Sequence, residues 1–160
     1  MVKMSSDSKR EVHCADAIPW MQARGKIAGA CAVTSLPDVS EVNLALPAWR
    51  MWFLAAVRLV IDAVPEESAA MFFQSDIKRE GVWIDKGAMV VRAAAHAVRF
   101  AKEQVGAKVV FDPFCGVGTV LAVANALGLD ALGVERARKR AERARELTLL
   151  PGELGGAGGG

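Results

Sequence analysis

Val109-Val110-Phe111-Asp112-Pro113-Phe114-Cys115-Gly116-Val117-Gly118-Thr119 is the stretch of sequence that determines the fold class. It begins with an apolar run typical of a buried strand, continues through a turn with two glycines, and is followed by an apolar helical segment. Glycines in such a turn let a ligand approach the backbone closely, and the start of the following helix offers unpaired N–H groups. The stretch therefore predicts a strand–loop–helix unit with a ligand bound at its loop.

A second acidic residue supports this interpretation. Roughly sixteen residues after Thr119, an expected strand over Ala131–Val134 stops at Glu135. In dinucleotide-binding folds an acid at about this distance hydrogen-bonds the ribose hydroxyls of the ligand. A nicotinamide cofactor fits less well, because its fingerprint has a third glycine where this chain has Leu121. A tight turn without any ligand is the other alternative, but the turn, the helix start and the second acid all agree on a ligand site.

Strands and helices alternate over the rest of the chain. Strands are expected over Glu11–Ala15, Ala28–Thr34, Ala69–Gln74, Lys108–Phe111 and Ala131–Val134, with a short extended piece at Val82–Ile84. Helices are expected over Ile18–Arg24, Trp49–Val64, Gly87–Gln104 with Asp85 as its N-cap, Thr119–Leu127, and from Arg136 to about Leu147. This order predicts an α/β fold of the Rossmann-like class, with a mostly parallel sheet covered by helices on both faces.

Length and composition narrow the remaining possibilities. The 160 residues, 52% of them hydrophobic, suit one folded domain over residues 9–150, between a flexible leader at 1–8 and a glycine-rich disordered tail at 151–160. The net charge of +2 does not require a nucleic-acid partner, and three widely spaced cysteines suit neither disulfides nor zinc. The most apolar stretch, Leu44–Val64, is interrupted by charges and a proline. We therefore expect an intracellular protein without a metal or a membrane span.

The loop Asp112–Thr119, hereafter the cofactor loop, resembles motif I of the exocyclic-amino methyltransferases of the adenine-N6/cytosine-N4 type. Gly133-Val134-Glu135 resembles that family's Gly-x-Glu strand end, and Asp16-Ala17 resembles its Gly-Asp-Ala segment, with Ala15 in place of the glycine. Lys86 resembles the lysine that precedes motif I in circularly permuted members. The resemblance implies S-adenosyl-L-methionine as cofactor. It assigns cofactor binding to Asp16, Lys86, Asp112, Pro113, Phe114, Cys115, Gly116, Gly118, Thr119 and Glu135.

The segment Ala32–Asp38 resembles the Thr-Ser-Pro-Pro-Tyr catalytic loop of the same family, and it precedes motif I as in the permuted members. The resemblance places catalysis in Ser35, Leu36, Pro37 and Asp38, hereafter the acceptor loop. In the family a polar side chain and the next carbonyl hold the target amino group toward the methyl sulfonium, and an aromatic residue stacks on the base. Here Leu36 replaces the first proline and Asp38 replaces the aromatic. Asp38 cannot stack, although it could orient a polar acceptor or act as a general base.

Three functions are compatible with this sequence. The first is a methyltransferase acting on an amino group of a nucleic acid, with Trp49 or Trp52 supplying the stacking. RNA is favoured over DNA as its substrate, because no separate target-recognition domain is visible. The second is a methyltransferase for a protein or small molecule, and the third is a non-catalytic cofactor-binding partner subunit. The basic segment Arg136–Arg145 could contact phosphates, but a solvated face, with Arg138 and Glu142 at ion-pair spacing, is the simpler explanation.

Overall fold

The computed structural model describes residues 8–73, 86–149 and 154, without the side chains of residues 39–40 and 86–93. The expected extended piece Val82–Ile84, its neighbour Asp85, and most of the expected leader and tail lie outside the described residues. The strands are β1 (Arg10–Cys14), β2 (Ala30–Thr34), β3 (Ala70–Phe72), β4 (Val109–Asp112) and β5 (Asp130–Glu135). The helices are α1 (Ala17–Arg24), α2 (Val39–Val42), α3 (Leu46–Ala63), α4 (Lys86–Glu103), α5 (Thr119–Ala126) and α6 (Arg138–Glu146).

Within the described residues, the five strands form one sheet in the order β1-β5-β4-β2-β3, and all neighbouring pairs are parallel. This confirms the expected α/β fold with a parallel sheet. The inner strands are mostly apolar because both of their faces are covered, and all five residues of β2 are buried.

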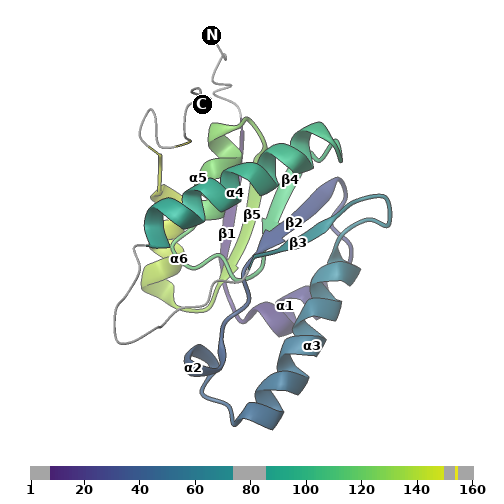
Figure 1. Ribbon diagram of the computed structural model, residues 1–160, viewed down its shortest axis with the longest axis vertical. Coiled ribbons are helices and arrows are strands. Elements are labelled where there is room, and N and C mark those ends of the chain that lie inside the picture. The colour runs from purple at the N-terminus through teal and green to yellow at the C-terminus, as the bar shows by residue number, and fades with distance from the viewer. Residues whose placement is uncertain (1–7, 74–85, 150–153, 155–160) are drawn as a thin grey trace.

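Helices form a layer on each side of the sheet (Figure 1). One layer contains α4, α5 and α6, whose buried alanines and valines pack with Cys31, Val33 and Val110 of the sheet. The other layer contains α1 and α3, which pack on Phe111, Leu132 and other residues of the opposite sheet face. Two separate apolar cores therefore hold the sheet rigid from both sides.

The sheet has a topological switch point between β4 and β2. From β4 the chain passes through α5, in one helical layer, to β5; from β2 it passes through α3, in the other layer, to β3. The backbone pairing of these two strands ends at Ala32 and Phe111. Loops that leave neighbouring strands toward opposite faces open a crevice at the carboxyl ends of those strands, which is where ligands bind in such sheets.

The short helix α2 was not expected from the sequence. It begins directly after Asp38, whose backbone N–H donates to Glu41 Oε2 at 3.0 Å. An acidic residue followed three positions later by a glutamate is a capping arrangement. The sequence Asp38-Val39-Ser40-Glu41 therefore contained the signal for this helix.

The helix α3 differs from the expected one in how its apolar residues are distributed. It begins at Leu46 with Pro47 in its first turn, a position that proline tolerates because the N–H there has no helical partner. The helical period of the sequence predicts one buried apolar face on this helix, formed by Trp49, Trp52, Phe53, Ala56, Val57, Val60, Ile61 and Val64. Ala56, Val60 and Val64 are buried, whereas Ile61 is 51% exposed. Among the described residues, no helix is long and apolar enough to cross a membrane.

Candidate functional site

A cavity of about 680 Å³ occupies the crevice at the carboxyl ends of the strands. This volume lies within the range of small-molecule sites. The predicted site residues that line it are Asp16, Ser35, Leu36, Pro37, Asp112, Pro113, Phe114, Cys115, Gly116, Thr119 and Glu135. Asp38 and Gly118 are not among the lining residues. Lys86 is the first residue of α4, and its side chain lies outside the described part of the chain.

The two glycines of the cofactor loop have left-handed backbones for different reasons. Gly118 has φ +87°, and a Cβ placed there would lie 2.7 Å from the Cα of Ala144 in α6. Gly116 has φ +54°, and a Cβ there would meet no atom within 4 Å. Because Gly116 lines the cavity and Gly118 does not, Gly116 exposes backbone to the cavity, whereas Gly118 lets the loop pack against α6.

A third glycine, Gly133, allows close packing behind the loop. A Cβ at this position in β5 would lie 2.6 Å from Leu121 Cδ1 and 2.9 Å from Cys115 Sγ. The Cys115 side chain therefore packs over Gly133, and burial together with the nearby carboxylates raises the pKa of its thiol. A thiol that stays protonated is a packing group rather than a nucleophile.

Asp112 is buried at the end of β4 and joins the two loops. Its Oδ1 accepts a hydrogen bond from Thr34 Oγ1 at 2.6 Å and from the backbone N–H of Phe114 at 3.1 Å. Burial raises the pKa of Asp112 to about 7, with a further contribution from the charge of Glu135, while the two hydrogen bonds act in the opposite direction. Desolvation is the largest of these effects, so the carboxyl group changes charge near neutral pH.

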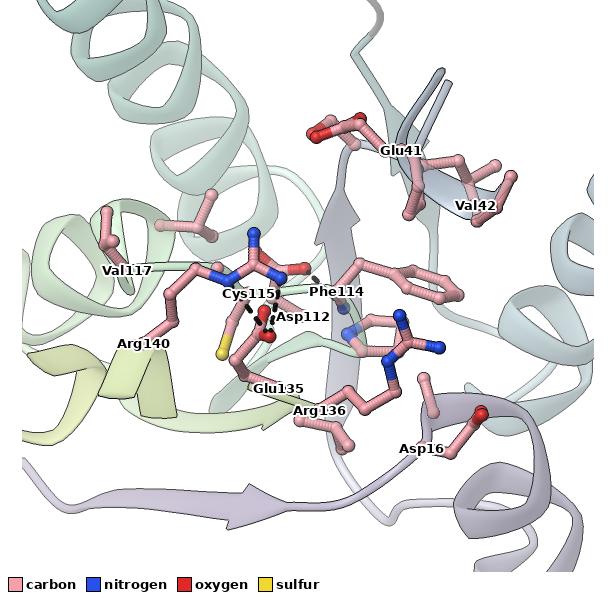
Figure 2. Close-up of a pocket in the computed structure, with 18 of the residues that line it drawn as sticks. Asp16, Glu41, Val42, Asp112, Phe114, Cys115, Val117, Glu135, Arg136 and Arg140 are labelled. Atoms are coloured by element: carbon pink, nitrogen blue, oxygen red, sulfur yellow. Dashed lines mark hydrogen bonds and ion pairs between the residues drawn. The ribbon is translucent and has the colours of Figure 1, made fainter. Parts of the chain in front are cut away.

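Glu135 ends β5 with its carboxylate at the cavity wall. Its Oε1 accepts hydrogen bonds from the backbone N–H of Ala137 at 2.6 Å and from Arg140 Nε at 3.1 Å. Arg140 Nη2 lies 2.9 Å from the same oxygen, so the carboxylate has a cationic partner although its residue is only 7% exposed. Figure 2 shows Arg140 reaching over this carboxylate from α6.

Asp16 reaches the same cavity because β1 and β5 are parallel neighbours. Cys14 pairs with Glu135 at the end of the two strands, which places Asp16 and Glu135 on one rim. The Asp16 side chain caps α1 by accepting from the backbone N–H of Ile18 at 3.0 Å. Arg136 extends toward Asp16 in the view of Figure 2.

The acceptor loop leaves β2 beside the cofactor loop. Leu36 is buried, whereas Ser35 and Pro37 are half-buried, and all three line the cavity. The Pro37 carbonyl accepts a hydrogen bond from Trp49 Nε1 at 3.3 Å, so one end of the loop is attached to α3. Leu36 and Pro37 therefore lie at the crevice, and Asp38 directly precedes α2.

Several cavity residues were not assigned from the sequence. They are Glu41, Val42 and Leu44 near α2, Phe73 after β3, and Arg136 and Arg140 after β5. Trp52 in α3, one of the two tryptophans considered for stacking, also lines the cavity. Trp52 packs edge-on against Phe114, with ring centroids 5.9 Å apart at 69°. The helical spacing of Trp49 and Trp52 indicated one packed face, but could not tell which indole reaches the cavity. In the structure it is Trp52, while Trp49 packs on Phe53 and donates to Pro37.

Comparisons with known proteins agree with the resemblance noted in the sequence. Residues 94–146, which hold the cofactor loop and Glu135, match a family model for N6/N4 methyltransferases described as DNA methylase. Two solved structures of TTHA0409 from Thermus thermophilus, described provisionally as a DNA modification methylase, share the fold. The selenomethionine derivative matches with a TM-score of 0.62 at 15% identity, and the complex with S-adenosyl-L-methionine with 0.51 at 17%. Each alignment covers 92% of this chain and 97% of the other. No curated protein sequence matches significantly.

Proposed function

Because residues 94–146 match a family model described as DNA methylase, we propose that this protein is an S-adenosyl-L-methionine-dependent methyltransferase acting on an amino group of DNA. The observation that carries the proposal is the single cavity wall formed by the cofactor loop, the acceptor loop and Glu135. A cofactor and an acceptor must share one cavity for a methyl group to pass directly between them.

The residues at the cavity fit the proposed cofactor. Gly116 leaves an open space where any other residue would place a Cβ, so the backbone can approach the ligand. Glu135 presents a carboxylate on the rim, suited to ribose hydroxyls, and Asp16, which follows the adjacent strand β1, is suited to the adenine amino group. Asp112 adds negative charge opposite a cationic ligand once it is ionised. When bound, the cofactor supplies an electrophilic methyl group on a sulfonium.

DNA replaces RNA as the favoured substrate class. The preference for RNA rested on the lack of a visible target-recognition domain, but 97% of the TTHA0409 chain aligns with this chain. A protein of closely similar length has therefore been described as a DNA modification methylase. The lack of a visible target-recognition domain is then no reason to favour RNA over DNA. The family description of residues 94–146 also names DNA.

The acceptor loop is proposed to hold the target nitrogen. By the resemblance of Ala32–Asp38 to the family's catalytic loop, Ser35 and the Leu36 carbonyl would accept hydrogen bonds from the amino group. Such bonds orient the nitrogen lone pair toward the methyl group, and orientation supplies a large part of the acceleration. The order of the two loops along the chain supports a circularly permuted member of the family.

The test is transfer of labelled methyl from S-adenosyl-L-methionine to duplex DNA, single-stranded DNA, RNA and protein in separate assays. We expect label in DNA for the wild type and a loss of about 100-fold for Ser35→Ala, because a misplaced amino group reacts far more slowly. Ser68→Ala is the matched control, since Ser68 is a serine outside the cavity. Label in RNA or protein alone would reassign the substrate. Binding of S-adenosylhomocysteine without transfer to any acceptor would favour a non-catalytic partner subunit.

A further inference from the structure

The hydrogen bond between Thr34 and Asp112 lies where the backbone pairing of β2 and β4 has ended. The two strands pair as far as Ala32 and Phe111. In that register Thr34 would face Pro113, which has no N–H to donate. Thr34 Oγ1 instead donates to Asp112 Oδ1 at 2.6 Å, and both residues are buried. This side-chain bond thus joins the two strands at the mouth of the crevice.

The same carboxylate oxygen also holds the start of the cofactor loop through a hydrogen bond. Asp112 Oδ1 accepts from the backbone N–H of Phe114, two residues further along the chain. Thr34 is the last residue of β2, so the acceptor loop begins with the next residue, Ser35. The Thr34 carbonyl also accepts from the N–H of Phe73, which lines the cavity. Asp112 Oδ1 is therefore hydrogen-bonded to Thr34, just before the acceptor loop, and to Phe114, near the start of the cofactor loop.

We propose that Thr34 is a positioning residue that couples the acceptor loop to the cofactor loop through Asp112. Filling the cofactor site then fixes the carboxylate of Asp112, and the bond from Thr34 transmits this order to Ser35 and Leu36. The proposal rests on the proposed function, because it assigns the two loops to cofactor and acceptor. It goes beyond that function by linking acceptor-site geometry to cofactor occupancy.

The coupling should change how the affinity for S-adenosylhomocysteine depends on pH. The Thr34 bond favours the ionised form of Asp112, whereas burial and the charge of Glu135 oppose it. The Cys115 thiol also interacts with the charge of Asp112, and its own pKa is raised. Arg140 pairs with Glu135 and lines the same cavity. Removing the Thr34 hydroxyl raises the pKa of Asp112, so affinity for a ligand with a cationic ammonium group, such as S-adenosylhomocysteine, should develop at higher pH.

The experiment measures S-adenosylhomocysteine affinity by calorimetry from pH 5.5 to pH 9, together with kcat for methyl transfer. Thr34→Val keeps the shape and removes the donor, and Thr34→Ser restores the donor. We expect Thr34→Val to shift the affinity profile upward by about one pH unit, and to lower kcat about tenfold at pH 7, since a hydrogen bond to a charged group is lost. Thr34→Ser should follow the wild type.

Ser68→Ala is the matched control, because it removes a hydrogen bond of the same length from the other end of β2. Ser68 Oγ donates to the Ala30 carbonyl at 2.6 Å. This variant should lose thermal stability without moving the pH profile. A Thr34→Val profile that superimposes on the wild type, or an equal shift in Ser68→Ala, would overturn the coupling.

Failure of the coupling is distinguishable from failure of the proposed function. A wild-type protein that binds no S-adenosylhomocysteine at any pH rejects the function, and the inference with it. If Thr34→Val does not fold, hydrogen exchange in the wild type gives the answer instead. S-adenosylhomocysteine should slow exchange at the Leu36 amide, and an unchanged rate there would overturn the proposal.

Discussion

The cofactor loop and the acceptor loop occupy equivalent places at the ends of the neighbouring strands β4 and β2, yet they are held in different ways. In the cofactor loop, local backbone geometry is decisive: two glycines have positive φ, and one of them packs directly on α6. The acceptor loop is held by side chains from distant elements, with Thr34 bonded to Asp112 at one end and Trp49 bonded to Pro37 at the other. A loop of the first kind can be identified from its own residues, whereas a loop of the second kind depends on its partners.

The largest effect should come from a comparison of the two glycines in the cofactor loop. A methyl group at Gly118 would lie within 3 Å of Ala144 backbone atoms, whereas at Gly116 it would enter open space. We expect Gly118→Ala to lower the free energy of unfolding by about 3–5 kcal/mol, from overpacking and left-handed strain together. Gly116→Ala should cost only about 1–2 kcal/mol, from strain alone. Urea denaturation measures both values.

Ligand binding should rank the two glycine variants differently. Because Gly116 lines the cavity, folded Gly116→Ala should lose S-adenosylhomocysteine affinity by at least about tenfold, as its methyl group fills the space of the ligand. Wild-type affinity in Gly116→Ala would contradict the assignment of this loop to the cofactor. Equal stability of the two variants would contradict the packing role of Gly118.

The features that could be predicted from the sequence are those whose physical cause lies in neighbouring residues. The strand before Asp112, the glycine turn and the acid at Glu135 were all predictable, because burial, positive φ and strand ends leave signals in the adjacent residues. The parallel sheet followed from the alternation of strands and helices. The capping pair Asp38 and Glu41 is likewise a local signal, and it marks the start of α2.

The contacts between elements could not be predicted in the same way. Nothing near Thr34 in the sequence indicates that its hydroxyl bonds Asp112, because the two residues are 78 positions apart. The same holds for Arg140, whose charge looked like part of a solvated helix until α6 placed it over Glu135. Periodicity put Trp49 and Trp52 on one helical face, but a rotation of a few tens of degrees decides which indole faces the cavity.

After the glycine substitutions, the next largest effect should come from the acceptor side of the cavity, because the acceptor loop has no aromatic residue at the family's stacking position. Trp52 lines the cavity and packs on Phe114, so it is the one of the two tryptophans considered for stacking that can reach an extruded base. We expect Trp52→Ala to raise KM for DNA about tenfold, since base–aromatic stacking contributes about 1–3 kcal/mol. The Kd of S-adenosylhomocysteine should change little, and Trp52→Phe should restore most of the lost affinity for DNA.

Trp49→Phe provides the control for this experiment. It removes the hydrogen bond to Pro37 while keeping an aromatic ring against Phe53. Its effect should fall on kcat, through the placement of the acceptor loop, rather than on KM. If Trp52→Ala weakens S-adenosylhomocysteine binding instead and leaves KM for DNA unchanged, Trp52 belongs to the cofactor side of the cavity.

The smallest effect should separate two arginines of α6 that look alike in the sequence. Arg138 pairs with Glu142 at 2.9 Å between two exposed side chains, whereas Arg140 pairs at 2.9 Å with the buried Glu135. An exposed helical pair contributes about 0.3–0.5 kcal/mol and is screened by salt, so Arg138→Met should change neither stability nor S-adenosylhomocysteine affinity measurably. Arg140→Met leaves a buried carboxylate without its cation, and should lower the affinity a few-fold because Glu135 loses its fixed orientation. Calorimetry at low and high salt compares the two variants. Indistinguishable affinities would mean that Glu135 is held by the Ala137 N–H alone, and that α6 contributes to the cofactor site only through its packing on Gly118.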